Sequence, residues 1–559
     1  MGPFDYLIVG AGPAGCVLAN RLSADPRVRV GLIEAGPDGN QKKHIIRTPL
    51  AMVTFMAPSL AFLGGPRFMD WFSTEPEPGL QGRAIALPRG IGVGGSSNVN
   101  GQIFIRGQRE DFDGWKALGC AGWGYDDLLP YFRKLERFEP LAEPDSLRHL
   151  RPEARKNIDP AFHGTDGALN IAALRSVNRL CEDYLDAAEA AGLKLNPDFN
   201  GATQEGAGYY TFTQRHGQRV TAEGAYIDPI RNRDNLTILS GRRVSRLDRD
   251  GTTIKGVVLA DGTRIAARET ILSAGAFGSP HLLMLSGIGP GAQLRRNGVE
   301  VAVDLPDVGR NLQDHLDVTL EYRAATRQPY GISWPALPRN ALHVADWLVR
   351  RRGLFASTTG EGGAFVRSRP DVERPDLQLF FCTARGNTQN AGGFTGHGFL
   401  MHVCELRPGS VGRLELAGPE AERKPSILYN FFRGDSDMRP LRDGIRLARR
   451  IIDQPMLKRH VAEEIDPGPE AQSDGALDAF IREKVGTLFH PVGTCAMGPD
   501  KVVDPRDMRV HGTSGLRVVD ASIMPRIVSG NTVAATYCLA ERAADLIAGA
   551  DAGMARDAA

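Results

Sequence analysis

The alternation of apolar and polar residues predicts a β-α-β unit at the N-terminus of the chain. An apolar run at residues 6–9 is followed by a glycine-rich turn and a helical stretch from Ala14 to about Ser23. A second apolar run, residues 28–33, ends at Glu34. Short apolar runs separated by a helical period are typical of parallel strands joined by a crossover helix.

Later segments carry equally clear periods. Residues 176–193 have helical periodicity, and residues 244–259 and 264–272 predict two paired strands with a turn at Asp261-Gly262. A basic, proline-interrupted stretch at 141–156 is typical of a surface loop. Two more helices are predicted, one over residues 439–452 and one starting near Thr532, with a frayed tail after Gly549. The apolar positions of the first helix are Leu441, Ile445, Leu447 and Ile451. Those of the second are Val533, Tyr537, Ala540, Ala544 and Ile547.

Composition narrows the class of protein. The 559 residues suggest two or three domains, and 42% hydrophobic residues are ordinary for a globular protein. A net charge of +1 gives no reason to expect a nucleic-acid partner. Seven scattered cysteines without a CxxC pair indicate neither a zinc site nor a disulfide framework, so we expect no metal and a reducing compartment. We find no signal peptide, and the apolar stretch 51–63 is too short to span a bilayer, so we expect a cytoplasmic protein.

The turn after the first strand has the spacing of a dinucleotide-binding fingerprint. Gly10 allows a tight turn, Gly12 lets the backbone approach a pyrophosphate, and Gly15 allows close helix–strand packing. The N-terminus of the helix attracts phosphate, and Glu34, 19 residues after Gly15, can accept both ribose hydroxyls. The acidic residue favours FAD or NAD over NADP, whose 2′-phosphate it would repel.

Three later segments suggest which dinucleotide it is. They are residues 89–101 (RGIGVGGSSNVNG) continuing to 107, residues 275–289 (GAFGSPHLLMLSGIG), and a C-terminal pair, 490–494 (HPVGT) with 520–532. Together with the N-terminal unit, in this order, they resemble the glucose–methanol–choline (GMC) oxidoreductases over essentially the whole chain. The likeness is greatest to bacterial choline-dehydrogenase-like and primary-alcohol dehydrogenases.

The resemblance implies an α/β fold with two interleaved domains. A Rossmann-like FAD-binding domain would comprise residues 1–167 (with a lid at 44–71), 221–315 and 488–550. A substrate domain, an antiparallel sheet flanked by helices, would comprise 168–220 and 316–487, leaving 551–559 as a tail. The lid contains Met52, Phe55, Met56, Phe62 and Met69. Such adaptable apolar side chains at a pocket mouth suit a hydrophobic or aromatic alcohol, although they suit core packing, a peripheral membrane contact or an oligomer contact equally well.

The family also implies a set of cofactor contacts. A glycine-rich loop with small polar side chains can lie against the isoalloxazine ring, Val244 matches the backbone that meets the adenine, and Asp520 and Ala521 match residues at the pyrophosphate and ribityl chain. Family members that attach flavin covalently have a histidine where this chain has Val99, so we expect non-covalent FAD. The implied cofactor-binding residues are Gly10, Gly12, Ala14, Gly15, Glu34, Ala35, Trp71, Arg89, Gly92, Gly95, Asn98, Val99, Asn100, Gly101, Val244, Asp520, Ala521, Asn531 and Thr532.

The implied catalytic pair is His490 and Asn531. Alcohol oxidation needs a base for the hydroxyl proton as the hydride leaves for flavin N5, and histidine suits this near neutral pH. His490 precedes a proline in a glycine-rich turn. Asn531 opens the last helix and can be its N-cap, the second active-site residue, or both, with the helix dipole aimed at the flavin. Together they would polarise an alkoxide as it forms.

Three further residues have weaker support. His315 follows a family motif, and a structural role suits it equally. Asp317 stands near the position where choline-oxidising members place a carboxylate against trimethylammonium, although an exposed aspartate is the simpler interpretation. Arg385 lies in the expected substrate domain and can bind a carboxylate or simply lie at the surface.

We therefore expect FAD-dependent oxidation of a primary alcohol to an aldehyde, with oxygen or a quinone-type molecule as acceptor and a dehydrogenase slightly favoured over an oxidase. Hydroxynitrile lyase or light-driven fatty-acid decarboxylase activity occurs on the same fold. A flavin-binding protein without catalysis and an NAD-dependent enzyme are further alternatives. The choice between monomer and homodimer stays open, as does peripheral membrane contact.

Overall fold

The first sheet is built around the N-terminal strand. In the computed structural model, which describes residues 2–56, 65–152, 158–385, 396–434 and 436–557, its strand order is β11-β2-β1-β14-β13-β12, with β26 also paired to β14. The strands β11, β2, β1, β14 and β26 pair in parallel, whereas β12, β13 and β14 are antiparallel. Their bounds are β1 (Phe4–Val9), β2 (Val30–Glu34), β11 (Leu236–Ser240), β12 (Val244–Asp250), β13 (Thr253–Leu259), β14 (Arg264–Leu272) and β26 (Leu516–Val518).

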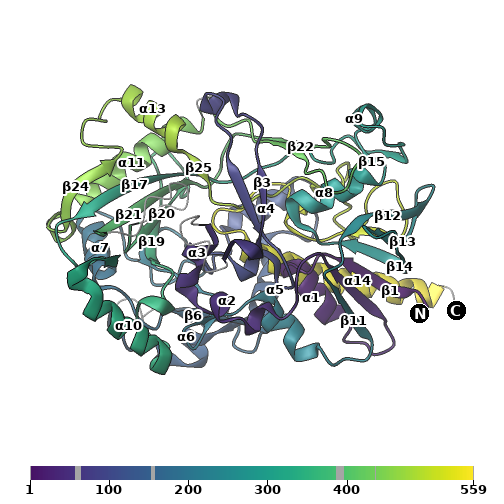
Figure 1. Cartoon of the computed structure of the whole chain (residues 1–559), viewed down its shortest axis with the longest axis horizontal. Helices are drawn as coiled ribbons and strands as arrows, with labels where there is room; N and C mark the ends of the chain where they lie inside the picture. The colour runs from purple at the N-terminus through teal and green to yellow at the C-terminus, as the bar shows by residue number, and fades with distance from the viewer. Residues whose placement is uncertain (1, 57–64, 153–157, 386–395, 435, 558–559) are drawn as a thin grey trace.

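The second sheet is antiparallel, and its strands come from residues 206–487, interleaved in the sequence with those of the first sheet. Its order is β24-β17-β21-β20-β19-β7, with β18 paired to β21 and β25 to β17. The bounds are β7 (Gly206–Tyr209), β17 (Leu316–Ala324), β18 (Gly331–Ile332), β19 (Gly360–Val366), β20 (Leu377–Cys382), β21 (Gly396–Glu405), β24 (Val461–Asp466) and β25 (Gly486–Thr487). The sheets lie at opposite ends of the molecule (Figure 1), and the chain passes between them more than once. The predicted interleaved α/β architecture is confirmed, and the domain boundaries stay a prediction.

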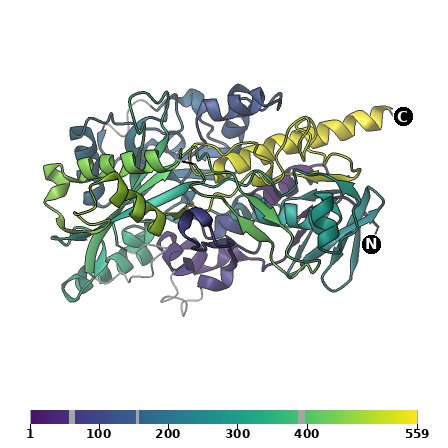
Figure 2. The same cartoon turned by 90° about the horizontal axis from the view of Figure 1, so that it is seen from above.

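Helices cover the outer faces of both sheets. Helices α1 and α14 pack on each other beside the first sheet, and α7 and α11 pack at the second (Figures 1 and 2). The α-helices are α1 (Pro13–Leu22), α2 (His44–Arg47), α3 (Met52–Met56), α4 (Arg109–Ala117), α5 (Tyr125–Leu135), α6 (Glu139–Ala142), α7 (Arg179–Ala190), α8 (Gly275–Leu285), α9 (Gly291–Arg296), α10 (Leu337–Arg350), α11 (Met438–Ile452), α12 (Pro455–Lys458), α13 (Asp474–Lys484) and α14 (Val533–Asp557).

Small sheets and a hairpin connect the two halves. The hairpin β3–β4 rises between the large sheets (Figure 1) and contributes to the site described below. These short strands are β3 (Met69–Ser73), β4 (Ala86–Gly90), β5 (Glu136–Phe138), β6 (Leu169–Ala173), β8 (Thr211–Phe212), β9 (Gln214–Arg215), β10 (Gln218–Arg219), β15 (Ile288–Gly289), β16 (Val303–Asp304), β22 (Arg413–Glu415) and β23 (Ser426–Leu428).

Three sequence predictions need correction. The single strand expected over residues 244–259 is the hairpin β12–β13, because Gly251 adopts a φ of +59° and reverses the chain. The stretch 141–156 was expected to be a loop, but Leu147 and Leu150 are buried in the core, and residues 153–156 lie outside the described residues. The last helix continues through Asp557 instead of ending at Gly549.

Candidate active site

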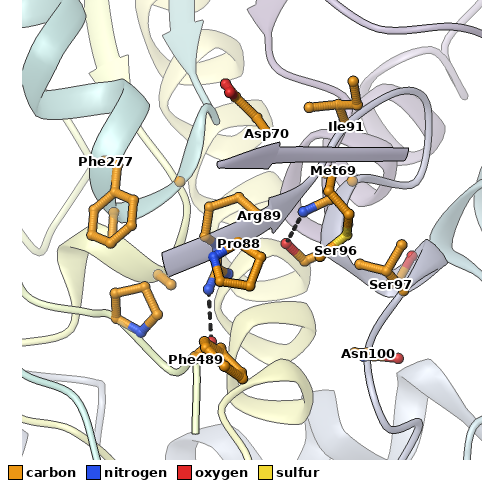
Figure 3. Close-up of a pocket in the computed structure, with 18 of the residues that line it drawn as sticks. Met69, Asp70, Pro88, Arg89, Ile91, Ser96, Ser97, Asn100, Phe277 and Phe489 are labelled. Carbon is orange, nitrogen blue, oxygen red and sulfur yellow. Dashed lines mark hydrogen bonds between the residues drawn. The ribbon is translucent and has the colours of Figure 1, made fainter. Parts of the chain in front are cut away.

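A cavity of about 740 Å³ lies between the two large sheets, at the carboxyl ends of β1 and β2. That size is within the range of cofactor and ligand pockets. Part of its wall is drawn in Figure 3, where Met69 and Asp70 of β3, Pro88 and Arg89 of β4, and Phe277 of α8 surround one end. The opposite wall comes from β19, β20 and β21 of the second sheet. Ligands of open α/β sheets bind at this edge.

The N-terminal glycines form a tight cradle beneath this cavity. Gly10 has a φ of +100°, and a Cβ there would lie 2.5 Å from the Ser273 carbonyl oxygen. A Cβ on Gly15 would lie 1.9 Å from the Gly10 carbonyl oxygen, so α1 reaches β1 this closely only with glycine. Helix α1 begins at Pro13 and directs its positive end at the cavity, where Gly10, Gly12 and Ala14 form part of the wall.

The carboxylate of Glu34 organises the loops around this cradle. One of its oxygens accepts a hydrogen bond from Ala11 N at 3.0 Å, and the other accepts from Gly36 N at 2.8 Å and Gly92 N at 3.0 Å. Glu34 also lines the cavity. It therefore joins the first β-α turn to the glycine-rich loop that begins at Gly92, and further acceptor capacity remains for a ligand's hydroxyl groups.

The glycine-rich loop follows β4 and lies against the cavity. Ser96 Oγ accepts a hydrogen bond from Gly90 N at 3.2 Å, a contact drawn in Figure 3. A Cβ on Gly95 would lie 2.7 Å from Gly12 Cα, which places the loop directly on the dinucleotide turn. A Cβ on Gly101, in contrast, would meet no atom within 4 Å. Close backbone packing on one side and open space on the other suit a flat group lying on the loop.

Most of the expected cofactor contacts line the cavity. The exceptions among the predicted residues are Gly15, Trp71, Gly92 and Asn98. Gly15 and Gly92 act through the backbone contacts given above. Asn98 is fully buried and donates to the Val93 carbonyl at 3.0 Å, whereas the Trp71 side chain is exposed on β3.

The two predicted catalytic residues meet in the cavity wall. Asn531 Nδ2 donates to His490 Nε2 at 3.3 Å, although the two residues are 41 positions apart. Asn531 Oδ1 accepts from Gln378 Nε2 at 3.4 Å. Helix α14 begins at Val533, so Asn531 precedes the capping position and its side chain is directed to His490 and Gln378. Asn531 lies close enough to the N-terminus of α14 to interact with the helix dipole.

His490 is also held from behind by His315. The two Nδ1 atoms are 2.9 Å apart, and the rings stand at 89° to each other. One Nδ1 must donate and the other accept. Because Asn531 donates to His490 Nε2, that nitrogen is unprotonated, and the proton of neutral His490 therefore lies on Nδ1 and is donated to His315.

Asp314 fixes the backbone of both histidines. Its Oδ1 accepts from His490 N at 2.8 Å and from His315 N at 2.9 Å, and its Oδ2 accepts from the Tyr429 hydroxyl at 2.9 Å. Phe489, immediately before His490, has a φ of +62°, which is uncommon for a bulky residue. Arg89 donates to the Phe489 carbonyl at 2.7 Å and holds this turn, as Figure 3 shows. Strain held in this way is common next to catalytic groups.

The protonation states follow from burial. Burial, the neighbouring His315 and the Arg89 guanidinium lower the pKa of His490 well below its usual value. Burial also lowers the pKa of His315 to about 4 and raises the pKa of Asp314 to about 7. His490 is therefore the neutral, proton-accepting form at neutral pH.

The second sheet places an ion pair in the opposite wall. His402 of β21 lines the cavity, and its Nδ1 lies 2.8 Å from Asp317 Oδ2 on β17. Although burial works the other way, the Asp317 carboxylate raises the pKa of His402 well above its usual value. Asp317 is 2% exposed, so the simpler interpretation of an exposed aspartate is wrong. Arg385 also lines the cavity, with its Nε 2.5 Å from Glu321 Oε1.

Asp520, from the C-terminal part of the chain, lines the cavity near the turn that precedes α8. Its carboxylate accepts from Gly275 N at 2.8 Å, Ser279 Oγ at 2.5 Å and Ser522 N at 2.8 Å. This orders the turn before α8 next to Ala521, and Asp520, Ala521 and Gly275 all line the cavity. The cradle of glycines, the acidic Glu34 and the helix start fit a dinucleotide, and the flat loop fits its ring.

Comparison with known proteins decides the family. Residues 4–317 and 408–540 match the N-terminal and C-terminal domain profiles of the GMC oxidoreductases. The chain belongs to this family. It is therefore an FAD-dependent alcohol oxidoreductase, as the sequence predicted.

Individual relatives of this GMC oxidoreductase cover nearly its whole length. It is 39% identical over 553 residues to an alcohol dehydrogenase [acceptor] of Pseudomonas putida, covering 97% of this chain and 95% of the relative. It is 40% identical over 556 residues to an oxygen-dependent choline dehydrogenase of Paraburkholderia phymatum, covering 98% and 92%. A structure of Aspergillus oryzae formate oxidase, from work on the effect of a mutation on FAD modification, superposes on this chain with a TM-score of 0.86 at 27% identity. The match covers 98% of each chain.

Several residues of this site were not predicted from the sequence. Asp314 directly precedes His315, and this adjacency could have pointed to it. No sequence pattern points to His402, because it reaches Asp317 only through the antiparallel register of β17 and β21. That register pairs Thr319 with His402 and Asp317 with Cys404. Of the expected lid, Met52 and Met69 line the cavity, while Phe55 packs on Phe68 in a separate small core. Phe62 lies outside the described residues.

Proposed function

We propose that this GMC oxidoreductase oxidises a primary alcohol to an aldehyde, with His490 accepting the hydroxyl proton. One observation carries the proposal: His490 lines the cavity with Nδ1 engaged by His315, which leaves the unprotonated Nε2 for the substrate. Asn531 Nδ2, 3.3 Å from that nitrogen, can donate to the same hydroxyl oxygen. A base and a donor at one oxygen favour the developing alkoxide.

The cofactor supplies the electron acceptor. Bound FAD would take the hydride of the alcohol carbon at its N5. Arg89, Gly95, Asn100 and Gly101 would hold the ring, and the Glu34 carboxylate the ribose. Val99 lines the cavity at the position of the family's tethering histidine, and a valine side chain has no nucleophile, so we propose that FAD binds non-covalently.

Apolar side chains in the cavity wall support a hydrophobic or aromatic alcohol. Phe380 and Leu400 of the second sheet line the cavity, as do Met52 and Val53 of α3. Asp317, the one carboxylate that resembled a trimethylammonium site, is paired with His402 and so is not free to bind a quaternary ammonium group. An apolar alcohol therefore suits this wall better than choline. The acceptor, oxygen or a quinone-type molecule, and a cytoplasmic location remain part of the same proposal.

The test is anaerobic flavin reduction by alcohols. Purified holoenzyme is mixed with benzyl alcohol, 1-octanol or choline, and the flavin absorbance near about 450 nm is followed. We expect reduction by the first two, and a rate 10²–10⁴-fold lower, roughly the value of a general base, in His490→Ala with FAD content unchanged. His511→Ala, a histidine outside the cavity lining, should match wild type. Equal rates in wild type and His490→Ala would refute the assignment. Reduction by no alcohol would point to the lyase or decarboxylase alternatives.

A further inference from the structure

Helix α10 turns its apolar side outward. It lies at the edge of the molecule in both overall views (Figures 1 and 2), preceded by a turn at Trp334–Ala336. The side chain of Trp334 is 87% exposed, that of Val349 81% and that of Leu342 69%. Leu337, Val344 and Leu348 are exposed as well. Leu337, Ala341, Leu342, Ala345, Leu348 and Val349 follow at steps of one, three and four residues, which places them along one side of the helix.

Three polar residues of α10, Arg339, Asn340 and His343, face the rest of the chain together with the buried Trp347, whereas Arg350 is exposed. Arg339 donates to the carbonyl groups of Arg327 and Pro329, and Asn340 donates to that of Gly331 at 3.1 Å. The His343 ring packs edge-on against Tyr330, with the ring centres 5.6 Å apart. A surface helix of a soluble protein normally buries its apolar stripe and exposes its polar one. In α10 most of the apolar side chains are exposed instead. Burial within this chain therefore does not account for the apolar residues on the outer face.

The segment that carries this face is rich in arginine. Residues 323–352 contain six arginines, one aspartate and no lysine or glutamate, and two of the six are paired, Arg323 with Glu463 and Arg350 with Asp346. Arg350 and Arg352 are exposed at the C-terminal end of α10, and Arg351 lies over the Trp347 ring at 5.0 Å. Exposed Trp and Leu side chains flanked by arginine are typical of helices that lie in the interface of an anionic membrane.

We propose that the Trp334–Val349 face docks on an anionic lipid surface, with α10 parallel to the membrane plane. A helix of 14 residues is about 21 Å long, too short to cross a hydrocarbon core of about 30 Å. None of the helices in the described residues is long and apolar enough to span a membrane. Insertion to the depth of the headgroups is the geometry that buries this one face.

Charge favours lipid over a second copy of the chain. A symmetric dimer through α10 would bring the arginines of one copy against those of the other, and like charges at an interface oppose association. An anionic bilayer supplies the opposite sign to the same residues, with each arginine near the surface contributing to binding.

The docked face adjoins the cavity walls. Helix α10 packs on the turn Leu354–Ala356, and Thr358 and Thr359, shortly after that turn, line the cavity. The same turn packs on Pro49–Ala51, which precedes the lining residues Met52 and Val53. An apolar alcohol dissolved in the bilayer would thus be delivered beside the site. This last consequence rests on the proposed function, whereas the docking itself does not.

The experiment is flotation of the full-length holoenzyme with vesicles. We expect binding to phosphatidylcholine vesicles containing about a third phosphatidylglycerol, and at least tenfold weaker binding to pure phosphatidylcholine. Leu342→Glu with Leu348→Glu should lower binding at least tenfold, because charged side chains would enter the apolar layer. Arg350→Gln with Arg352→Gln should lower it roughly tenfold on anionic vesicles alone. Val411→Glu, a matched change at another exposed apolar residue, should have no effect.

Two controls separate docking from folding and from catalysis. FAD content and anaerobic flavin reduction by a water-soluble alcohol should be unchanged in the Leu342→Glu/Leu348→Glu variant, and the vesicle-induced blue shift of tryptophan emission should disappear in Trp334→Phe. Absence of vesicle binding by wild type, or equal binding by the glutamate variant, would overturn the proposal. So would a dimer in solution that the glutamate variant dissociates, since the face would then bind a second copy. The flotation and tryptophan readouts do not depend on which alcohol is oxidised.

Discussion

The contact between His315 and His490 can be tested directly. Among the described residues His315 does not line the cavity, so we expect it to affect the reaction through His490. In His315→Leu an apolar side chain fills part of the space of the imidazole ring, and the acceptor that lies 2.9 Å from His490 Nδ1 is lost. The Nδ1 proton of His490 would then be buried without a partner. The other tautomer would place the proton on Nε2, where it opposes the Asn531 Nδ2 donor and where the substrate needs a base.

The expected size of the effect follows from the lost hydrogen bond. A buried donor left without an acceptor costs about 1–3 kcal/mol, and about 1.4 kcal/mol corresponds to a factor of ten. We therefore expect the limiting rate of flavin reduction to fall roughly 5- to 150-fold. The apparent Kd for the alcohol should stay nearly unchanged, because the substrate wall is intact.

The assay is anaerobic stopped-flow reduction of the holoenzyme over a range of alcohol concentrations. His315→Gln, which keeps an amide oxygen as acceptor, should recover part of the rate, and His511→Leu should behave as wild type. A His315→Leu enzyme that reduces its flavin at the wild-type rate would refute the tautomer argument. A loss confined to the Kd would do the same, since it would place His315 in substrate binding.

Three further outcomes are expected. Gly15→Ala should purify with little FAD, because its Cβ would lie 1.9 Å from the Gly10 carbonyl oxygen. Gly114→Ala, with open space at its Cβ, should keep its flavin. The ratio of flavin to protein absorbance measures the FAD content of both variants. His402→Gln should leave the ratio of kcat/KM for choline over benzyl alcohol nearly unchanged, because burial raises the pKa of Asp317 and the carboxyl group, without its cationic partner, would take up a proton instead of attracting choline; a tenfold rise in that ratio would contradict this argument. Burial raises the pKa of Asp314 to about 7 from 3.8, so the folded state retains this proton longer and loses stability as pH rises from about 4 to 7, by about 4 kcal/mol. Asp314→Asn should lack this decline in urea titrations, and parallel stability curves of the two proteins would speak against it.

The N-terminal β-α-β unit could be predicted from local sequence alone. Gly10, Gly15 and Glu34 act within one β-α-β unit, so their spacing carries both the fold and the dinucleotide site, and the predicted turn, helix and strand are confirmed. The hairpin β12–β13 was missed because the apolar alternation continues on both sides of Gly251. The proposed catalytic pair could be predicted from family motifs, because His490 and Asn531 lie in recognisable segments.

Residue spacing and motif order were thus enough to predict the family, the interleaved α/β architecture and the cofactor class, and they selected His490 and Asn531 as the proposed catalytic pair. They could do so because each of these depends on residues close together in the chain or on motifs in a fixed order. Three other features became visible only in the folded molecule: His490 contacts His315 and Asp314, Asp317 is paired with His402, and α10 exposes its apolar side. These three features depend on strand register, on burial and on which face of a helix meets the core, and such quantities are set by contacts between distant parts of the chain.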